Sequence, residues 1–281
     1  KSIKFLENIK DAKIIFSYLN EIGEDSKVRF VGGCVRKALC GENIDDIDLA
    51  TTLVPDEVKK RLAKKEVKVI DTGISHGTVT AILNRKKFEI TTLRKDVSTD
   101  GRHANVQFTL SWEQDALRRD FTINAIYADI EGRIFDPLNG ISDLQNGKIK
   151  FIGLPEERIQ EDYLRILRYL RFFTQYSKLD HDQDTIKSIR KNINGLNKIS
   201  NERIFDELKK ILSLKNIYSL FTHNRSKEII LNNILAIEEK RKIPGEKKET
   251  KKNKKMEIKL RIQEGRRKKT YYYYYDYYYY Y

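Results

Sequence analysis

Residues 30–52 read FVGGCVRKALCGENIDDIDLATT, and this stretch decides the fold of the chain. Its first residues belong to an apolar run that predicts a strand, and the next ones predict a short helix that ends at Gly41. Gly32 and Gly33 lie at the turn between them, where the lack of a Cβ lets backbone N–H groups approach a phosphate. Arg36 follows one helical turn later and would add positive charge beside the same anion.

A second strand-like run follows this helix and carries Asp46, Ile47 and Asp48. Because alternate residues of a strand face the same side, the two carboxylates converge while Ile47 faces the core. Converging carboxylates repel each other unless a cation lies between them, and hard oxygen ligands suit Mg²⁺. We therefore predict a Mg²⁺ site on Asp46 and Asp48, although Asp-x-Asp by itself is also common in solvated edge strands.

Gly-Gly-x-Val-Arg followed so closely by Asp-x-Asp resembles the nucleotidyltransferase signature of the polymerase β superfamily. The resemblance is to the bacterial-type tRNA CCA-adding enzymes and their poly(A) polymerase relatives. One departure is Lys37, where the family usually has an acidic residue. The resemblance extends over residues 28–212, and its further blocks follow in order at residues 113–128, 135–140, 161–173 and 199–208.

The resemblance implies roles for residues of the first half that their local pattern leaves open. Glu89 matches the position of a third acidic group beside the aspartate pair; the alternative is a plain exposed strand carboxylate. Arg119 matches a contact to the triphosphate of the incoming nucleotide, and the alternative is an internal Arg–Asp pair. The resemblance thus implies that the catalytic residues are Asp46, Asp48 and Glu89, and that the nucleotide binds to Gly33, Arg36 and Arg119.

Residues 161–173 predict one helix with a buried apolar side and a polar stripe at every third position. For an isolated helix, such a stripe is typical of a salt-bridged surface. In the resembled family, the first Asp and Arg of the stripe read the base edge, whose donors and acceptors they match in pairs. The resemblance therefore assigns the base to Asp162 and Arg165, and phosphates to Arg168 and Arg171.

Three smaller expectations concern local structure. The apolar positions around residues 117–126 predict a core-packed segment that includes Leu117. Residues 95–106 are polar and rich in turn residues, which predicts a mobile loop between two strands. Ser200 is placed to cap the N-terminus of a helix that braces the neck.

The predicted fold is α+β, with an N-terminal nucleotidyltransferase head that contains a twisted mixed sheet. An all-helical neck and a truncated helical body follow. The expected boundaries are residues 1–145 for the head, 146–212 for the base-recognising neck, 213–240 for a partial helical body, and 241–281 for a disordered tail.

The chain has 281 residues and a formal net charge of +14. Residues 241–281 hold 14 Lys and Arg against 5 Asp and Glu, a net charge of +9, so most of the positive charge belongs to the tail. The tail ends in a run of tyrosines, which resembles a repeat expansion more than an evolved fold. A basic balance suits a polyanionic partner such as RNA without identifying it.

The two cysteines, Cys34 and Cys40, are too few for a disulfide framework and favour a reducing, cytoplasmic setting. No apolar run reaches the roughly 20 residues that span a bilayer. No charged-then-apolar signal segment opens the sequence. We therefore expect a cytoplasmic protein with no membrane partner.

The function implied by the resemblance is Mg²⁺-dependent, template-independent nucleotide transfer to an RNA 3′ end. The partners would be CTP, ATP and a tRNA, to which C, C and A are added. A poly(A) polymerase that extends RNA with AMP is the alternative, because it shares the same blocks. A catalytically inactive, truncated RNA-binding remnant is a further alternative, and the oligomeric state stays open.

Overall fold

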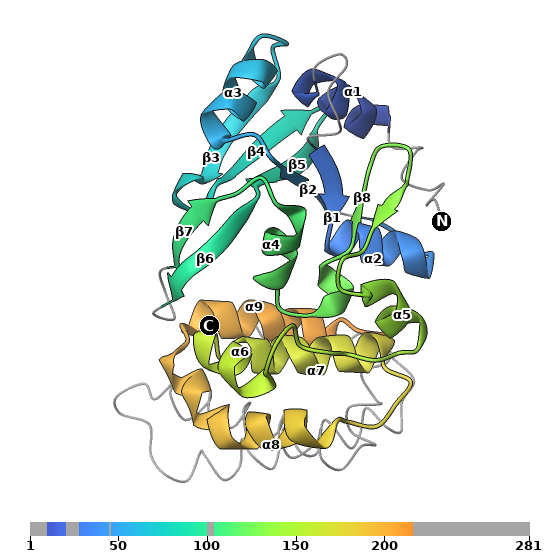
Figure 1. Ribbon diagram of the computed structural model, residues 1–281, viewed down its shortest axis with the longest axis vertical. Helices are drawn as coiled ribbons and strands as arrows, with labels where there is room; N and C mark the ends of the chain where they lie inside the picture. Colours follow the sequence, from blue (N-terminus) through green and yellow to red (C-terminus); the bar gives the residue numbers. More distant parts are fainter. Residues whose placement is uncertain (1–9, 21–27, 45, 100–103, 216–281) are drawn as a thin grey trace, which may run out of the picture. The chain divides into compact units, whose positions relative to one another are not determined.

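The computed structural model describes residues 10–20, 28–44, 46–99 and 104–215 (Figure 1). The expectations for the tail 241–281 and for all but the first residues of the partial body concern residues outside this part. The described residues form a mixed sheet with helices, followed by a set of helices, which confirms the predicted fold class. The exact domain boundaries stay a prediction.

The centre of the first part is a seven-stranded mixed sheet with the order β3-β4-β5-β2-β1-β8-β9. Strands β2 and β5 pair in parallel, and the other neighbours are antiparallel. The two strands predicted on either side of the glycine turn and its helix are confirmed as β1 (Val28–Val31) and β2 (Ile47–Thr51). The other strands of the sheet are β3 (Lys68–Gly73), β4 (Thr78–Leu83), β5 (Lys86–Thr92), β8 (Tyr127–Ala128) and β9 (Ile134–Phe135).

The central strands of this sheet bury one face in the main core and carry both carboxylates and a second apolar cluster on the other. Ile47 and Leu49 of β2 join Phe88 and Ile90 of β5 in the main core, where helices α1 (Lys10–Leu19), α2 (Gly33–Cys40) and α3 (Pro55–Ala63) also bury apolar side chains. Because side chains alternate along a strand, the residues between them face the other way. Asp48 and Glu89 lie on that second face.

The prediction of a mobile loop at residues 95–106 is wrong for most of these residues. Strands β6 (Arg94–Thr99) and β7 (Ala104–Phe108) form an antiparallel hairpin with a register shift between Asp96 and Ser98. Ladder hydrogen bonds are made by the backbone, so a polar sequence can form a hairpin without an apolar stripe. Residues 100–103 at its tip lie outside the described residues.

A short segment connects the hairpin to the helices that follow. It contains α4 (Trp112–Leu117), the 3₁₀ turn η3 (Thr122–Asn124) and α5 (Gly140–Gln145). The prediction that Leu117 packs in the core is wrong, because its side chain is 56% exposed at the end of α4. Ala116 and Asp115 occupy the buried side of this six-residue helix instead.

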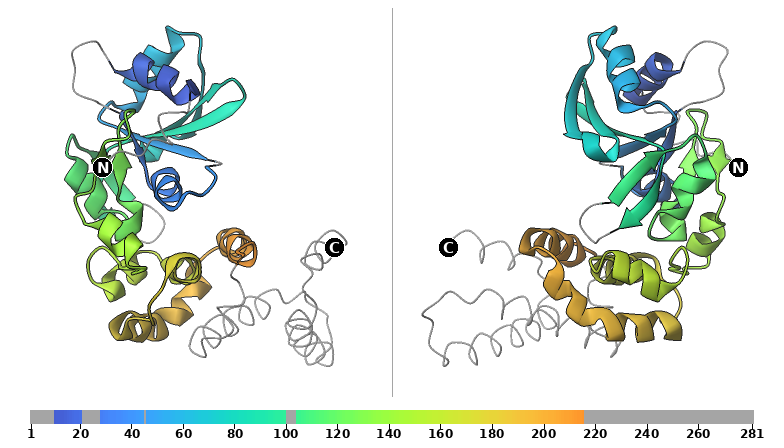
Figure 2. Two further views of the ribbon diagram at one scale, coloured as in Figure 1. Left: turned by 90° about the vertical axis from the view of Figure 1, so that its right-hand side faces the viewer. Right: turned by 60° about the vertical axis from the view of Figure 1, so that its left-hand side comes forward.

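The second part of the described chain is helical. Helix α7 packs against α9, and α6 against α8 (Figure 2). Ser200 lies at the N-cap position of α9 as expected, but its side chain makes no capping hydrogen bond. The bounds are α6 (Pro155–Glu161), α7 (Arg165–Tyr176), α8 (Gln183–Asn192), the 3₁₀ turn η4 (Ile193–Lys198) and α9 (Asn201–Leu212).

The single helix predicted for residues 161–173 is interrupted after Glu161. Asp162 has φ −153° and ψ 103°, which ends α6, and α7 begins at Arg165. The Oδ1 atom of Asp162 accepts a hydrogen bond from the Leu164 amide at 3.1 Å. Asp side chains compete in this way with helical hydrogen bonds, so the periodic pattern continues through a break in the backbone.

Candidate active site

The predicted carboxylates meet on the polar face of the sheet. Asp48 of β2 and Glu89 of β5 are register partners in the parallel ladder, and Asp46 directly precedes β2. The pKa of Asp48 is raised to about 6, first by burial and then by the charge of Glu89. Asp46 adds to this increase, whereas Arg119 and Arg36 oppose it. Two negative and two positive side chains therefore surround Asp48.

These carboxylates suit a cation that also binds waters or substrate phosphates. The negative charge on Asp48 is disfavoured by its surroundings, which a cation would offset. Within the described residues, no three His, Cys, Asp or Glu side chains converge to hold a metal ion by themselves. Mg²⁺ is usually bound by one or two carboxylates together with waters and substrate phosphates, so Asp46 and Asp48 suit it.

The glycine turn lies directly against Asp48. Gly32 has φ +67°, a conformation that L side chains rarely adopt. A Cβ built on Gly33 would lie 3.8 Å from Asp48 Oδ2 and 4.0 Å from Arg36 Nη2. Because Gly33 is also the first residue of α2, backbone N–H groups at this helix end lie beside the carboxylate.

Arg36 extends from α2 toward the helical part. Its Nη1 donates to Asn124 Oδ1, and its guanidinium lies 4.6 Å from the centroid of the Phe172 ring and 5.2 Å from that of Tyr176. The residue is buried, and its Nε has no hydrogen-bond partner within the described structure. Arg36 thus connects the glycine turn with helix α7.

Arg119 forms the internal ion pair that was the alternative to phosphate binding. Its Nη2 lies 2.9 Å from Asp115 Oδ2, and Arg118 Nη2 lies 2.7 Å from Asp115 Oδ1. Burial favours the protonated acid, but the two arginines outweigh it and lower the pKa of Asp115 well below its usual range. The second amino group of the same guanidinium faces the glycine turn, because Arg119 Nη1 lies 3.6 Å from a Cβ built on Gly32.

Arg168 ties helix α7 to the sheet-containing part. Its Nη2 lies 2.6 Å from Asp120 Oδ2, and Asn124 donates to the second oxygen of this carboxylate at 2.8 Å. Burial opposes ionisation of Asp120, yet Arg168 and these hydrogen bonds lower its pKa to about 2. Asn124 therefore contacts both Asp120 and Arg36, which joins the two arginines in one network.

The other members of the polar stripe also form ion pairs within the protein, and Asp162 and Arg165 have different partners. Asp162 Oδ2 lies 2.7 Å from Arg203 Nη2 of α9, and Arg165 Nη1 lies 2.6 Å from Glu161 Oε2. Arg171 pairs with Glu207 of α9 at 2.5 Å, with both side chains largely buried. The stripe is salt-bridged, as its alternative interpretation stated, but much of it lies between elements instead of on the surface.

Comparisons with known proteins bear on this arrangement. Residues 28–150 match the family model described as "Poly A polymerase head domain". Residues 178–223 match "Probable RNA and SrmB- binding site of polymerase A". The human mitochondrial CCA tRNA nucleotidyltransferase 1 is 47% identical over 211 residues, which are 74% of this chain and 48% of that protein.

Solved structures are similar over the same part of the chain. The Bacillus stearothermophilus CCA-adding enzyme in complex with CTP aligns with a TM-score of 0.66 and 34% identity, over 79% of this chain and 51% of that one. A tRNA nucleotidyltransferase complexed with a primer tRNA and an incoming ATP analog aligns with a TM-score of 0.61 and 27% identity, over 74% and 59%.

This chain belongs to the tRNA CCA-adding nucleotidyltransferase and poly(A) polymerase family. The resemblance read from the sequence is thereby confirmed. The chain spans about half the length of the curated relatives it matches.

Several residues at the candidate site form ion pairs that the sequence analysis did not identify. Asp115 precedes Arg118 and Arg119 by three and four residues, a helical spacing that could have predicted its ion pairs. Arg203 and Glu207 had no such signal. They follow their partners on α6 and α7 by more than 30 residues, so only the packing of α9 brings them together.

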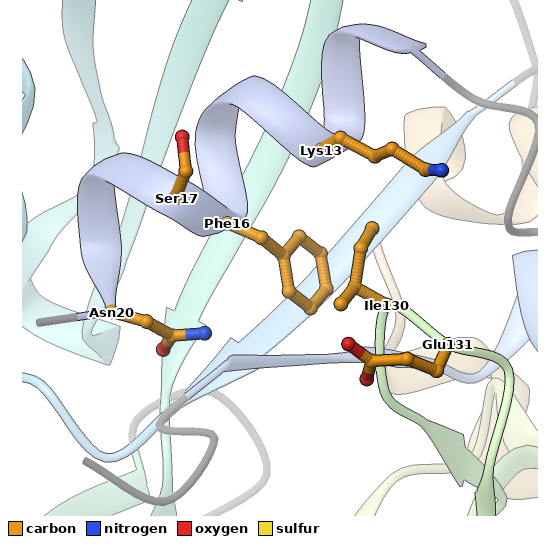
Figure 3. Close-up of a pocket in the computed structure, with 6 residues that line it drawn as sticks. All are labelled: Lys13, Phe16, Ser17, Asn20, Ile130 and Glu131. Carbon is orange, nitrogen blue, oxygen red and sulfur yellow. The ribbon is translucent and has the colours of Figure 1, made fainter. Parts of the chain in front are cut away.

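A pocket in the head of this family member lies apart from the carboxylates. It is lined by residues of α1 such as Phe16, by Asn20 directly after this helix, and by the turn that follows β8, which includes Glu131 (Figure 3). Phe16 belongs to the main core, on the apolar face of the sheet. Asp48 and Glu89 face the opposite way, so this pocket is not part of the candidate site.

No helix of the described segments combines the length and apolar character that crossing a lipid bilayer requires. The two cysteines are free thiols, Cys34 buried and Cys40 exposed.

Proposed function

We propose that this chain transfers CMP and AMP from CTP and ATP to the 3′ end of tRNA without a template. The observation that carries the proposal is the close approach of the glycine turn to Asp48, which puts phosphate-binding backbone and metal-binding carboxylate in one place. The names of the similar proteins support the substrates, since one structure contains CTP and another contains a primer tRNA with an ATP analog.

The carboxylates would hold the metal of this reaction. Asp46 and Asp48 are the proposed Mg²⁺ ligands, and Glu89 is the proposed third acidic group, because it is the register partner of Asp48. When bound, Mg²⁺ lowers the pKa of a hydroxyl nucleophile and stabilises the charge on a pyrophosphate leaving group. The protein side chains would orient the RNA 3′ end and the triphosphate for in-line transfer.

The triphosphate is proposed to bind along the glycine turn. Gly33 begins α2, and the backbone N–H groups at this helix end would bind the phosphates. Arg119 Nη1 lies near the same turn, while Asp115 holds Nη2 of the same guanidinium group. An arginine held in this way loses little conformational entropy when it binds an anion. Arg36, Arg168 and Arg171 are proposed to add positive charge around the phosphates.

The base is proposed to be read by Asp162 and Arg165. Paired donors and acceptors on these side chains suit the edges of cytosine and adenine. Both side chains are bonded to protein partners in this structure, Asp162 to Arg203 and Arg165 to Glu161. Binding of a nucleotide would therefore exchange at least part of these contacts for contacts to the base.

One observation favours a second candidate function. The family model that covers residues 28–150 is described as a poly(A) polymerase head domain. A poly(A) polymerase would use the same carboxylates and glycine turn with ATP alone. The third possibility is the catalytically inactive RNA-binding remnant, which would transfer no nucleotide.

An extension assay separates these three candidates. The full chain is incubated with Mg²⁺ and a tRNA that lacks its 3′ CCA, in the presence of CTP, ATP or both. We expect addition of two C residues with CTP alone, full CCA with both nucleotides, and no product in excess EDTA. Long A tracts with ATP alone would instead show a poly(A) polymerase, and no product in any mixture would support the remnant.

We propose a cytoplasmic location, which the free cysteines support. The human relative is named as mitochondrial, so the compartment of relatives does not decide the question. Fractionation of cells that carry an epitope-tagged chain tests this, and recovery with mitochondria would contradict it.

A further inference from the structure

Three arginine side chains surround one aromatic ring where the sheet-containing part meets the helices. The guanidinium carbons of Arg171, Arg36 and Arg168 lie 4.1, 4.6 and 5.5 Å from the centroid of the Phe172 ring. Arg36 comes from α2 beside the glycine turn, whereas the other two belong to α7. All three distances are within the roughly 6 Å over which a ring quadrupole attracts a cation.

The ring itself is fixed in place. Phe172 is 2% exposed, and it meets Phe121 edge-on with centroids 5.5 Å apart and planes at 75°. Tyr176 stacks on it at 6.4 Å. Because the neighbouring rings hold Phe172 firmly, its faces present a fixed negative potential to the arginines.

The charges of the three arginines are not fully balanced. Arg168 and Arg171 each have a carboxylate, Asp120 and Glu207. Arg36 has no carboxylate within 4.0 Å among the described residues, and its buried Nε lacks a hydrogen-bond partner there. One positive charge of the set is thus available to an anion, and Nη2 of Arg36 lies 4.0 Å from a Cβ built on Gly33.

We propose that Phe172 is a positioning residue that holds Arg36, Arg168 and Arg171 as one set for the nucleotide triphosphate. This inference rests on the proposed nucleotide transfer and extends it to a side chain with no polar group. Like-charged guanidinium groups repel each other, and a shared ring offsets that repulsion without neutralising them. Without the ring, Tyr176 would be the remaining aromatic contact of Arg36 on α7 among the described residues.

The test compares F172L and F172M, which remove the ring, with F172Y, which keeps it. F151L is the matched control. Phe151 is also 2% exposed and also packs on Phe121, but its ring contacts among the described residues are with other aromatic rings. Dissociation constants of CTP, ATP and CMP are measured for the full chain, together with the unfolding temperature and transfer kinetics.

We expect F172L and F172M to weaken CTP and ATP binding by about tenfold, which corresponds to about 1.4 kcal/mol. CMP binding should change less than about twofold, because the arginines are proposed to hold the outer phosphates. F172Y should bind CTP like the unaltered chain, and F151L should do so too even where its unfolding temperature falls as far as that of F172L.

Two results would overturn the inference. Equal weakening of CTP and CMP would show a loss of general fit, and equal CTP binding by F172L, F172M and the unaltered chain would show that the ring is not needed. Either result leaves the proposed transfer standing if the unaltered chain extends tRNA. If the unaltered chain binds no nucleotide at all, the proposed function and this inference both fail.

Discussion

Asp48 is the single residue on which the proposed chemistry depends most. Asp48→Asn keeps the shape of the side chain but removes a metal-binding charge, so transfer should fall by about a hundredfold or more. The fold should survive. Burial and Glu89 already disfavour the charge, so the unfolding temperature should stay equal or rise. Turnover and thermal unfolding are measured together.

A suitable control for Asp48→Asn is Asp56→Asn. Asp56 is an exposed acid in the first turn of α3, and its carboxylate pairs with Lys59 of the same helix. The Asp56→Asn substitution should change turnover only slightly. Near-normal turnover in Asp48→Asn would reject the metal assignment, and a loss of folded protein would make Asp48 a structural residue instead.

The two arginines at the start of α7 should differ in what they contribute. Arg165→Ala should reduce discrimination between CTP and UTP by about 1–3 kcal/mol, the value of a bidentate base contact. Arg168→Ala should weaken binding of both nucleotides alike. Transition-state discrimination is measured as the ratio of kcat/KM values for the two nucleotides. An unchanged ratio in Arg165→Ala would remove its base-reading role.

Arg168→Ala has a second consequence that the experiment must separate. The substitution leaves Asp120 buried beside Asn124 without its ion pair, and breaking a buried pair in this way destabilises a protein by about 3–5 kcal/mol. Kinetics should therefore be measured well below the unfolding temperature of each variant. An Arg168→Lys variant keeps the charge and tests whether charge alone is sufficient.

Among the secondary-structure elements, helices α7 and α9 are joined by a buried ion pair between Arg171 and Glu207. Glu207→Gln would leave the Arg171 charge uncompensated, and we expect the free energy of unfolding to fall by about 3 kcal/mol. Asp206→Asn on the same helix is the control, since its pair with Lys209 is exposed and worth less than about 1 kcal/mol. Chemical denaturation of both variants measures the difference. Equal, small losses would mean that the α7–α9 contact depends on apolar packing alone.

For the chain as a whole, the basic tail should affect RNA binding more than chemistry. Residues 241–281 carry a net charge of +9, and residues 241–269 have few apolar residues, so the tail should attract RNA phosphates without reading sequence. A chain that ends at Lys240 should keep its turnover at saturating RNA but bind RNA more weakly at low salt. The difference should disappear as salt rises, because released counterions drive such binding.

Turnover and RNA affinity of both chains at two salt concentrations test this expectation. Lost turnover at saturating RNA would place the tail in the folded body, and the boundary at residue 240 would then be wrong. Equal affinity at low salt would mean that the tail charges do not reach the RNA.

Strands β1 and β2, the glycine turn and the shared face of Asp46 and Asp48 could be predicted from the sequence. These features depend on neighbours in the chain: side-chain alternation fixes which strand residues share a face, and two adjacent glycines permit the turn. The strand pattern predicted Asp46 and Asp48 on one face, whereas only the family resemblance placed Glu89 beside them; the β2–β5 ladder makes Asp48 and Glu89 register partners.

The partners of the polar side chains that pair across elements were decided only by the tertiary structure. Arg168, Arg171 and Asp162 bond to residues that lie more than 30 positions away, and no local periodicity encodes such pairs. The tertiary structure also decided that Asp162 ends a helix, since its carboxylate bonds both to the following turn and to Arg203 of α9. A buried charge must find a partner wherever the packing supplies one, and the packing of distant elements is settled only when the whole chain folds.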